Sequence, residues 1–240
     1  QERQKITREM QEVSEMIALA TDKDALLLFA ASPDFNPGVV GLAASRLADR
    51  HYRPAIVGHV DEKTTVCSCR SISEFHITDA LDECADLLVR HGGHAAAAGF
   101  TIRNENVGAF LKRMREIAAE KLAGVDLRPV LVADMELALE SLSFEMLEHL
   151  HYLEPTGYGN PRPVFVSRNL GVKSSRTVGK EQTHLKLTVT DGKATLDAIA
   201  FRLGHLKADL PAKIDLLYTF EVNEWNGRKS LQLNVKDIKF

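Results

Sequence analysis

Hydrophobic and polar positions follow two different patterns along the 240-residue chain. In roughly the first half, segments with an apolar residue at every third or fourth position alternate with short continuous apolar runs. Residues 1–20 and 25–31 are the first example of each. The first spacing is typical of amphipathic helices and the second of buried strands. Their alternation predicts an α/β domain with a largely covered sheet.

The elements predicted for this domain follow from that pattern. Helix 1–20 begins without a capping residue, so we expect it to continue from an upstream segment of a longer polypeptide. A Gly/Ala-rich turn is predicted at 91–99. The other predicted helices are 39–50, 79–90 and 106–122, and the predicted strands are 25–31, 54–60, 64–69 and 100–103.

From Pro129 onward the pattern becomes that of an all-β domain. A strand at 130–139 and a helix at 144–152 lead to a rigid stretch at 154–163, which holds three Pro and two Gly. Asn226-Gly227 predicts a tight hairpin turn. The strands predicted after the rigid stretch are 164–170, 184–190, 195–201, 214–222 and 230–238, with a helix at 203–210. Five strands with one intervening helix fit a small Greek-key barrel of the oligonucleotide-binding (OB) type.

The composition is that of a globular protein, with 45% hydrophobic and 26% charged residues. No stretch approaches the roughly 18 apolar residues of a membrane span, and residues 1–10 lack the apolar core of a signal peptide. We therefore expect a cytoplasmic protein with no membrane partner. The odd number of cysteines argues against a disulfide framework. We favour a structural role for Cys67, Cys69 and Cys84 over a metal or redox role, because Cys67-Ser-Cys69 lacks a second ligand pair for zinc.

The net charge of −3 conceals an asymmetry along the chain. Residues 163–240 hold 13 Lys and Arg against 8 Asp and Glu, a balance of +5, whereas residues 1–162 hold 17 against 25, a balance of −8. Clustered cations bind polyanions by releasing condensed counterions. A solvated surface gives the same excess, so both interpretations remain open at this point.

Two short segments of the α/β domain have the chemistry of phosphate recognition. In the first, Gly92 and Gly93 allow backbone amides to approach an anion, and His94 can donate to a phosphate oxygen. In the second, Arg70 presents a fork of donors beside the hydroxyl of Ser71. Each has a structural alternative, which is a turn that needs glycine for the first segment and a surface ion pair for Arg70.

The barrel offers candidates of its own. Apolar and polar residues alternate along 184–190 and 230–236, which gives each strand one buried face and one polar face. Lys186 lies on such a polar face, where it can contact a sugar-phosphate backbone. Trp225, beside the hairpin turn, can stack on a base or fold back over the barrel rim, and the sequence favours neither.

Several segments taken together resemble a known family. The segments 36–47, 53–56, 70–72 and 92–99 occur in the order and spacing of the DHH-associated domain of the DHH phosphoesterase superfamily. Segments 154–165, 184–187, 198–201 and 225–227 resemble the barrel that follows this domain in RecJ exonucleases, and Glu2-Arg-Gln4 resembles the helix that links the catalytic domain to it. The resemblance implies a linker helix at 1–22, a DHH-associated α/β domain at 23–126, a connector at 127–162 and an OB-type barrel at 163–240.

The resemblance also implies a function in DNA repair and recombination. Family members are exonucleases that digest single-stranded DNA from the 5′ end, using Mn²⁺ or Mg²⁺ held by a DHH domain. No Asp-His-His triplet occurs in this sequence, so we expect no catalytic residue, no bound metal and no nuclease activity in the 240 residues alone. The implied role is the wall of the cleft that faces the missing DHH domain of the same polypeptide, with phosphate contacts from Arg70, Ser71, Gly92, Gly93 and His94.

One position departs from the family pattern, and two other functions remain possible. Asn36 stands where family members usually carry His, which leaves a direct role for this side chain open. The first alternative is an oligonucleotide or cyclic-dinucleotide phosphodiesterase of the same superfamily, although short substrates have no need of a long basic barrel. The second is a non-enzymatic RNA-binding module, because alanyl-tRNA synthetase carries a similar associated domain; the 2′-hydroxyl group would distinguish the two nucleic acids.

Overall fold

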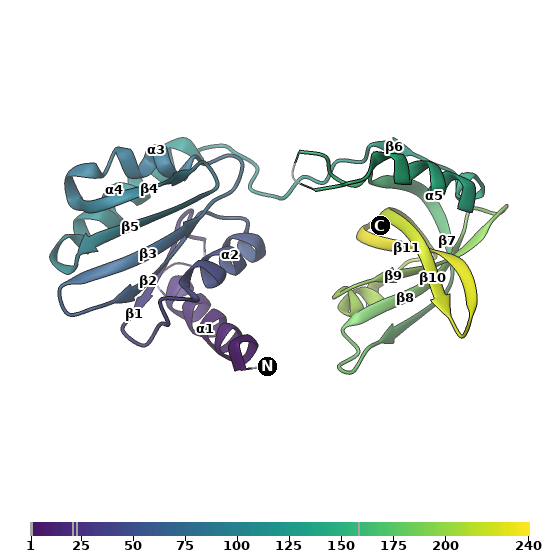
Figure 1. Cartoon of the computed structure of the whole chain (residues 1–240), viewed down its shortest axis with the longest axis horizontal. Helices are drawn as coiled ribbons and strands as arrows, with labels where there is room; N and C mark the ends of the chain where they lie inside the picture. The colour runs from purple at the N-terminus through teal and green to yellow at the C-terminus, as the bar shows by residue number, and fades with distance from the viewer. Residues whose placement is uncertain (1, 21, 23, 158) are drawn as a thin grey trace. The chain divides into compact units, whose positions relative to one another are not determined.

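The computed structural model describes residues 2–20, 22, 24–157 and 159–240, without the side chains of residues 2–6 and 225. The chain forms two compact units, Gln1–Pro129 and Val130–Phe240 (Figure 1). The side chains of Glu2, Arg3 and Gln4, which carry a small part of the family resemblance, lie outside the described residues.

A five-stranded sheet forms the centre of the first unit, with the strand order β1-β2-β3-β5-β4. Only β1 and β2 are parallel, and the other three pairings are antiparallel. The strands are β1 Leu28–Ser32, β2 Ala55–Val60, β3 Thr64–Arg70, β4 Leu88–His94 and β5 Ala97–Arg103.

Helices cover both faces of this sheet. α1 (Glu2–Leu19) and α2 (Val40–His51) pack on one face, where Ala43 and Leu47 are buried against Val57 of β2. α3 (Ile77–Asp82) and α4 (Val107–Lys121) pack on the other. Phe110 and Met114 of α4 are one helical turn apart and share that second core with Ile56. The neighbours Ile56 and Val57 therefore face opposite cores, as strand geometry requires.

The helix predicted at 79–90 is wrong in its second half. α3 begins earlier, at Ile77, where His76 caps it by accepting a hydrogen bond from the Asp79 amide. It ends at Asp82, and β4 begins at Leu88. The apolar spacing of this segment suits a helix, but β4 pairs with β5 and satisfies backbone groups that would otherwise remain unpaired. The tertiary pairing thus overrides the local pattern.

The Gly/Ala-rich turn predicted at 91–99 is also too long. His94 and Ala97 pair directly, so the turn consists of Ala95 and Ala96 alone and most of the segment is strand. The short side chains let β4 and β5 form a tight hairpin whose tip lies beside the end of β3.

A closed barrel forms the centre of the second unit. Its strands follow the order β10-β11-β9-β8-β7, and β10 pairs with β7 to close the barrel. The interior is filled by alternate residues such as Leu185, Leu187 and Val189. The helix predicted at 203–210 is a 3₁₀ helix, η5 (Gly204–Asp209). The strands are β7 Phe165–Val178, β8 His184–Thr190, β9 Thr195–Ala200, β10 Lys213–Trp225 and β11 Arg228–Lys239.

The residues before the barrel pack onto it. The strand predicted at 130–139 is reduced to β6 (Met135–Glu136), which pairs with β7. It is followed by η3 (Leu139–Ser141), α5 (Phe144–Leu150) and η4 (His151–Leu153). Leu139 and Leu142 are buried in the barrel core, so this stretch forms part of the second unit. In the described part of the chain, no helix is long and apolar enough to cross a membrane.

Candidate nucleic-acid interface

One face of the first sheet carries most of the predicted phosphate-binding residues. Residues that lie directly opposite each other in paired strands point to the same side of a sheet, and so do alternate residues along one strand. Three rows across β3, β5 and β4 therefore share this face, namely Arg70–Ala97–His94, Ser68–Gly99–Gly92 and Val66–Thr101–Arg90. This surface is called the row face below.

The row face is partly covered by α2 and open over β4. At Gly41 of α2, a Cβ atom would lie 3.6 Å from the Ser68 hydroxyl and 3.7 Å from Nη2 of Arg70. The helix thus contacts the β3 side of the face. His94 and Gly92, on the β4 side, are exposed. The uncovered part is the space in which a ligand could contact both ends of the first row.

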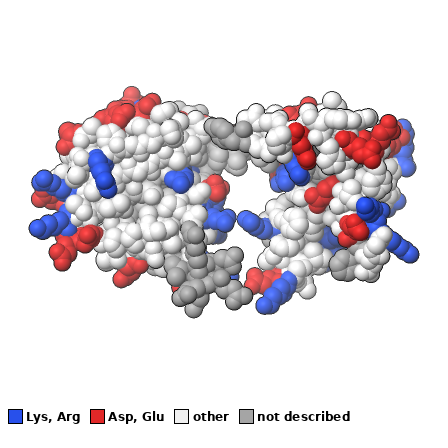
Figure 2. Space-filling model, viewed as in Figure 1, with Lys and Arg blue, Asp and Glu red and all other residues white. Residues whose placement is uncertain are grey.

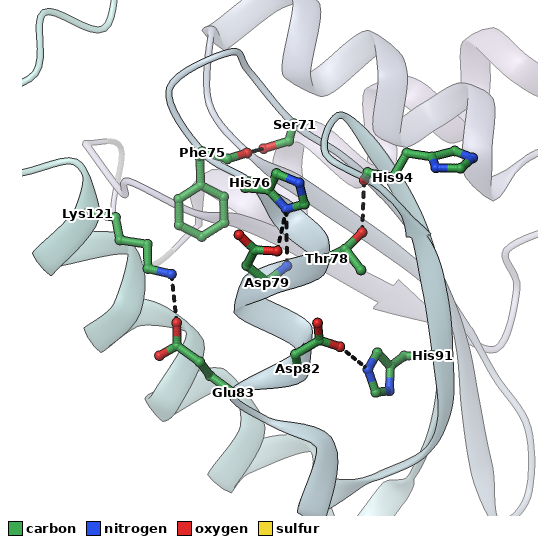
Figure 3. Close-up of polar contacts among 10 residues, drawn as sticks. All are labelled: Ser71, Phe75, His76, Thr78, Asp79, Asp82, Glu83, His91, His94 and Lys121. Atoms are coloured by element: carbon green, nitrogen blue, oxygen red, sulfur yellow. Dashed lines mark hydrogen bonds and ion pairs between the residues drawn. The ribbon is translucent and has the colours of Figure 1, made fainter.

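Arg70 and His94 have unused donor capacity. Nη1 of Arg70 donates to its neighbour's carbonyl, Cys69 O, at 2.8 Å, and no described carboxylate pairs with the guanidinium. The His94 imidazole is exposed and has no hydrogen-bond or ion-pair partner among the described residues. In Figure 3 its ring points away from Thr78, whose hydroxyl donates to the His94 carbonyl at 2.9 Å.

The hairpin tip that carries His94 is fixed by the loop after β3. The amide of Ser71 donates to Ala96 O at 2.9 Å, and the amide of Ile77 donates to Ala95 O at 3.0 Å. The hydroxyl of Ser71 donates to Phe75 O at 2.6 Å (Figure 3). Ser71 therefore uses both its amide and its hydroxyl proton to shape this loop, and its contribution to the row face is to position the tip.

The two adjacent glycines have different physical roles. Gly93 has φ of +154°, and a Cβ there would lie 2.3 Å from Ala97 O and 2.4 Å from Ala98 Cα, so only glycine fits. Gly92 has no atom within 4 Å of its would-be Cβ position. Glycine at Gly92 thus leaves the row face open, whereas Gly93 makes the hairpin possible.

Other polar groups near this region are engaged elsewhere. Nδ1 of His76 accepts from the Asp79 amide and lies 2.9 Å from the Asp79 carboxylate, and Nε2 of His91 lies 2.7 Å from the Asp82 carboxylate (Figure 3). Asn36 is exposed, and its Oδ1 accepts a hydrogen bond from the Gly38 amide at 2.8 Å, which shapes the turn before α2. Among the described residues, no group of three or more His, Cys, Asp or Glu could hold a metal ion. These residues therefore do not offer the ligand set of a two-metal centre.

The three cysteines are buried, and their burial makes them poorly reactive. All three are free and lie in the core shared by α3 and α4. Burial raises the pKa of the Cys67 thiol to about 12 and that of Cys84 to about 11. Burial also raises the pKa of Cys69 well above its ordinary value. None of these groups is a nucleophile at neutral pH.

The barrel candidates have a mixed outcome. Lys186 lies 3.1 Å from Asp197, and its side chain is only 23% exposed, so its charge is largely compensated. Trp225 ends β10 and pairs with Arg228, but its side chain lies outside the described residues. On the face shown in Figure 2, Lys and Arg are interspersed with Asp and Glu over the barrel. The exposed cations of the barrel that have no carboxylate partner among the described residues include Lys173, Arg176, Lys180 and Arg202.

Two exposed residues with donor or aromatic side chains, Arg90 and Phe201, were not among the candidates that the sequence provided. Arg90 lies on the row face, and its Nε donates to the Thr101 hydroxyl at 3.2 Å. It was assigned to a helix, so its place beside Gly92 could not be inferred. Phe201 follows β9 and is 52% exposed. Alternation along the sequence could not reveal this exposure, because Ile199, which has the same phase as Phe201, is buried together with Ala198 and Ala200.

The two units match two domain families. Residues 22–120 match the DHHA1 domain, and residues 133–237 match the RecJ OB domain. The protein therefore belongs to the class in which an α/β DHHA1 domain is followed by an OB barrel. This confirms the fold expected from the sequence.

Curated relatives agree with this pairing of domains. The chain is 35% identical to the single-stranded-DNA-specific exonuclease RecJ of Bacillus subtilis over 98% of its own length and 30% of that protein. It is 33% identical to RecJ of Haemophilus influenzae over 86% of its own length and 37% of that protein. The chain thus spans about a third of the length of these relatives.

Solved structures of RecJ have a similar fold. RecJ from Thermus thermophilus in complex with Mg²⁺ aligns with a TM-score of 0.81 and 27% identity, over 100% of this chain and 36% of that one. Its complex with Mn²⁺ gives a TM-score of 0.82 and 26% identity, over 100% of this chain and 34% of that one. The chain therefore contains a DHHA1 domain and a RecJ OB domain, and over this length it is similar to RecJ exonucleases.

Proposed function

We propose that this chain is the DNA-binding C-terminal portion of a RecJ-type 5′-to-3′ exonuclease that acts on single-stranded DNA. The observation that carries this proposal is the first row of the row face, where Arg70 and His94 lie on either side of Ala97. Two groups that can donate to an anion thus flank a residue with only a methyl side chain. The relatives' names support DNA rather than another polyanion as the ligand.

The residues of the row face would bind and orient the DNA backbone. The guanidinium of Arg70 can donate two parallel hydrogen bonds to one phosphate, and the imidazole of His94 can donate to the same or the next phosphate. Gly92 leaves room for the sugar-phosphate chain to lie close to β4. Ser71 positions the hairpin tip through its contacts with Ala96 and Phe75. The residues of the row face would thus contribute to catalysis by orienting the scissile bond.

The chemistry of water activation would come from Mn²⁺ or Mg²⁺ held by a DHH domain of the same polypeptide. Solved RecJ structures in complex with these ions support this assignment, and the described residues offer no ligand set for them. We accordingly propose single-stranded DNA and that DHH domain as partners, in the cytoplasm, where a DNA-repair nuclease meets its substrate.

The OB barrel would hold the strand away from the site of cleavage. OB-type barrels bind oligonucleotides across their second and third strands, which are β8 and β9 here. Arg176 and Arg202 are exposed near these strands and free of carboxylate partners among the described residues. We retain Lys186 and Trp225 as proposed contacts with the strand. The charge of Lys186 is partly compensated by its ion pair with Asp197.

The test is cleavage by a full-length RecJ enzyme that carries this sequence. We expect Arg70→Ala and His94→Ala each to lower kcat/KM for a labelled single strand by about 100-fold, because a lost phosphate contact misplaces the scissile bond. Arg115→Ala is the matched control, since Arg115 is exposed on α4, which packs on the opposite face of the sheet. Wild-type cleavage by both row-face variants, at unchanged melting temperature, would overturn the assignment.

A further inference from the structure

Two aromatic rings, those of Phe201 and His184, contact each other at one end of the barrel. Phe201 directly follows β9, and its ring is 52% exposed. It meets the ring of His184, the first residue of β8, edge-on, with centroids 5.2 Å apart and planes at 72°. His184 is half-buried, so Phe201 is the outer member of the pair.

The pair is held rigidly by backbone contacts. The amide of Arg202 donates to Nδ1 of His184 at 3.1 Å, which fixes the ring and places its proton on Nε2. The amide of Gly204 donates to Thr183 O at 2.9 Å, and a Cβ at Gly204 would lie 2.6 Å from Gln182 O. The segment after β9 is therefore clamped to the loop before β8.

The backbone on both sides of this clamp adopts an uncommon conformation. Arg202 has φ of 63° and Gln182 has φ of 52°, and neither is glycine. Left-handed backbone at such residues costs free energy and persists where the surrounding structure requires it, often at functional sites. Here it turns the chain sharply after Phe201, so that Leu203 packs against the core while Phe201 remains outside.

The surroundings of the pair suit a polyanion. Arg202 and Lys180 are exposed, and Arg176 lies opposite Lys186 in the pairing of β7 with β8. The opposing charges are Glu181, which is exposed, and Asp197, which is paired with Lys186. An exposed ring with cations around it is the arrangement that proteins use to bind single strands, with the ring under a base and the cations on the backbone.

We propose that Phe201, supported by His184, is a base-stacking platform for single-stranded DNA on the barrel. The inference rests on the proposed function and adds the residue on which a base stacks. It differs from Trp225 in position, because Phe201 lies where β8, β9 and the loop 179–183 meet, whereas Trp225 lies at the tip of the β10–β11 hairpin.

The experiment uses the 240-residue chain and two labelled strands of equal length. One is an oligothymidylate, and the other is an abasic strand with the same phosphates and no bases. Fluorescence anisotropy gives the affinity for each. Phe201→Ala should weaken binding of oligothymidylate by about 5- to 150-fold, the range for loss of one stacked base, and leave the abasic strand unchanged. Phe201→Trp should retain the affinity for both strands.

Phe144→Ala is the matched control, because Phe144 is 46% exposed in the same unit and lies at the start of α5. It should change neither affinity, and thermal melting should show that all variants are folded. Unchanged oligothymidylate binding in Phe201→Ala overturns the platform, as does an equal loss on both strands, since that loss would not depend on bases. Absence of binding by the unaltered chain overturns the proposed function together with the platform.

Discussion

Arg70 and His94 lie on the same face of the DHHA1 sheet because both are paired with Ala97 of β5. Adjacent strands are about 4.8 Å apart, so two strand spacings, roughly 10 Å, separate their backbones. Two long side chains at this separation can converge on one phosphate above the Ala97 methyl group. The pairing of β3, β5 and β4 thus brings onto one face two residues that are 24 positions apart in the sequence.

The two adjacent glycines give a first prediction about folding. Gly93→Ala should destabilise the first unit by more than about 2 kcal/mol, because a methyl group there clashes with Ala97 and Ala98. Gly92→Ala should change stability by less than about 1 kcal/mol, because no atom lies near its would-be Cβ. Chemical denaturation of both variants measures the difference. Equal destabilisation by the two substitutions would contradict the hairpin geometry.

A second prediction concerns the stability of the barrel unit and its dependence on pH. The carboxylate of Asp191 accepts hydrogen bonds from the amides of Ala194, Lys193 and Leu139 at 2.8 to 2.9 Å. These bonds, that from Ala194 foremost, lower the pKa of Asp191. The stabilisation is therefore complete above the unfolded-state pKa, near 3.9, and is lost as the pH falls through the lower folded-state pKa.

Asp191→Asn should accordingly lower the free energy of unfolding at pH 7 by less than about 1 kcal/mol, because water screens this largely exposed carboxylate, and the difference from wild type should shrink below about pH 4. Asp209→Asn serves as a control, because Asp209 is exposed at the end of η5. Urea denaturation between pH 3 and pH 8 provides the measurement. A difference that persists unchanged at the lowest pH would show that the charge of Asp191 is not what matters.

A third prediction follows from the buried thiols. With pKa values of about 12 for Cys67 and about 11 for Cys84, almost no thiolate exists at pH 8 in the folded chain. A colourless aromatic disulfide reagent should therefore release colour very slowly from the native protein and rapidly after denaturation. Fast reaction of one thiol in the native protein would place that cysteine at the surface.

A fourth prediction separates binding from catalysis. The 240-residue chain should release no nucleotides from a labelled single strand in Mn²⁺ or Mg²⁺, because its described residues hold no cluster of three or more metal ligands. Metal-dependent turnover that His94→Ala abolishes would reveal a metal site formed by this chain, and the division of labour proposed above would be wrong.

Local sequence patterns predicted most of the fold. The strand His184–Thr190 has the predicted bounds, because its strict alternation of apolar and polar residues has only one interpretation. Asn226 and Gly227 both have positive φ, as the predicted hairpin turn requires. In contrast, β4 is a strand because it pairs with the edge of β5, and the spacing of apolar residues within the segment cannot reveal that pairing. The row face, which depends on that pairing, could be inferred only from the family resemblance.

The barrel shows the same limit for side-chain partners. The alternation of apolar and polar residues along the strand predicted that Lys186 would be an unpaired cation on the polar face. In the structure, Asp197 lies diagonally across the β8–β9 pair and compensates its charge. That contact depends on the register of two strands, which the sequence left undetermined. Neither the exposure of Phe201 nor its contact with His184 could be inferred from alternation along β9, because Ile199, in phase with Phe201, is buried.

The central claim, that this chain is a single-stranded-DNA-binding portion, is tested by one titration, in which we expect the barrel, with its charge balance of +5 over residues 163–240, to carry most of the affinity. Fluorescence anisotropy with a labelled single strand is measured at several salt concentrations for the whole chain and for the two compact units, 1–129 and 130–240. We predict that 130–240 binds almost as tightly as the whole chain, with a log–log salt slope of about −0.7 for each phosphate contacted. Binding by 1–129 as tight as that of the whole chain, with none by 130–240, would contradict the account.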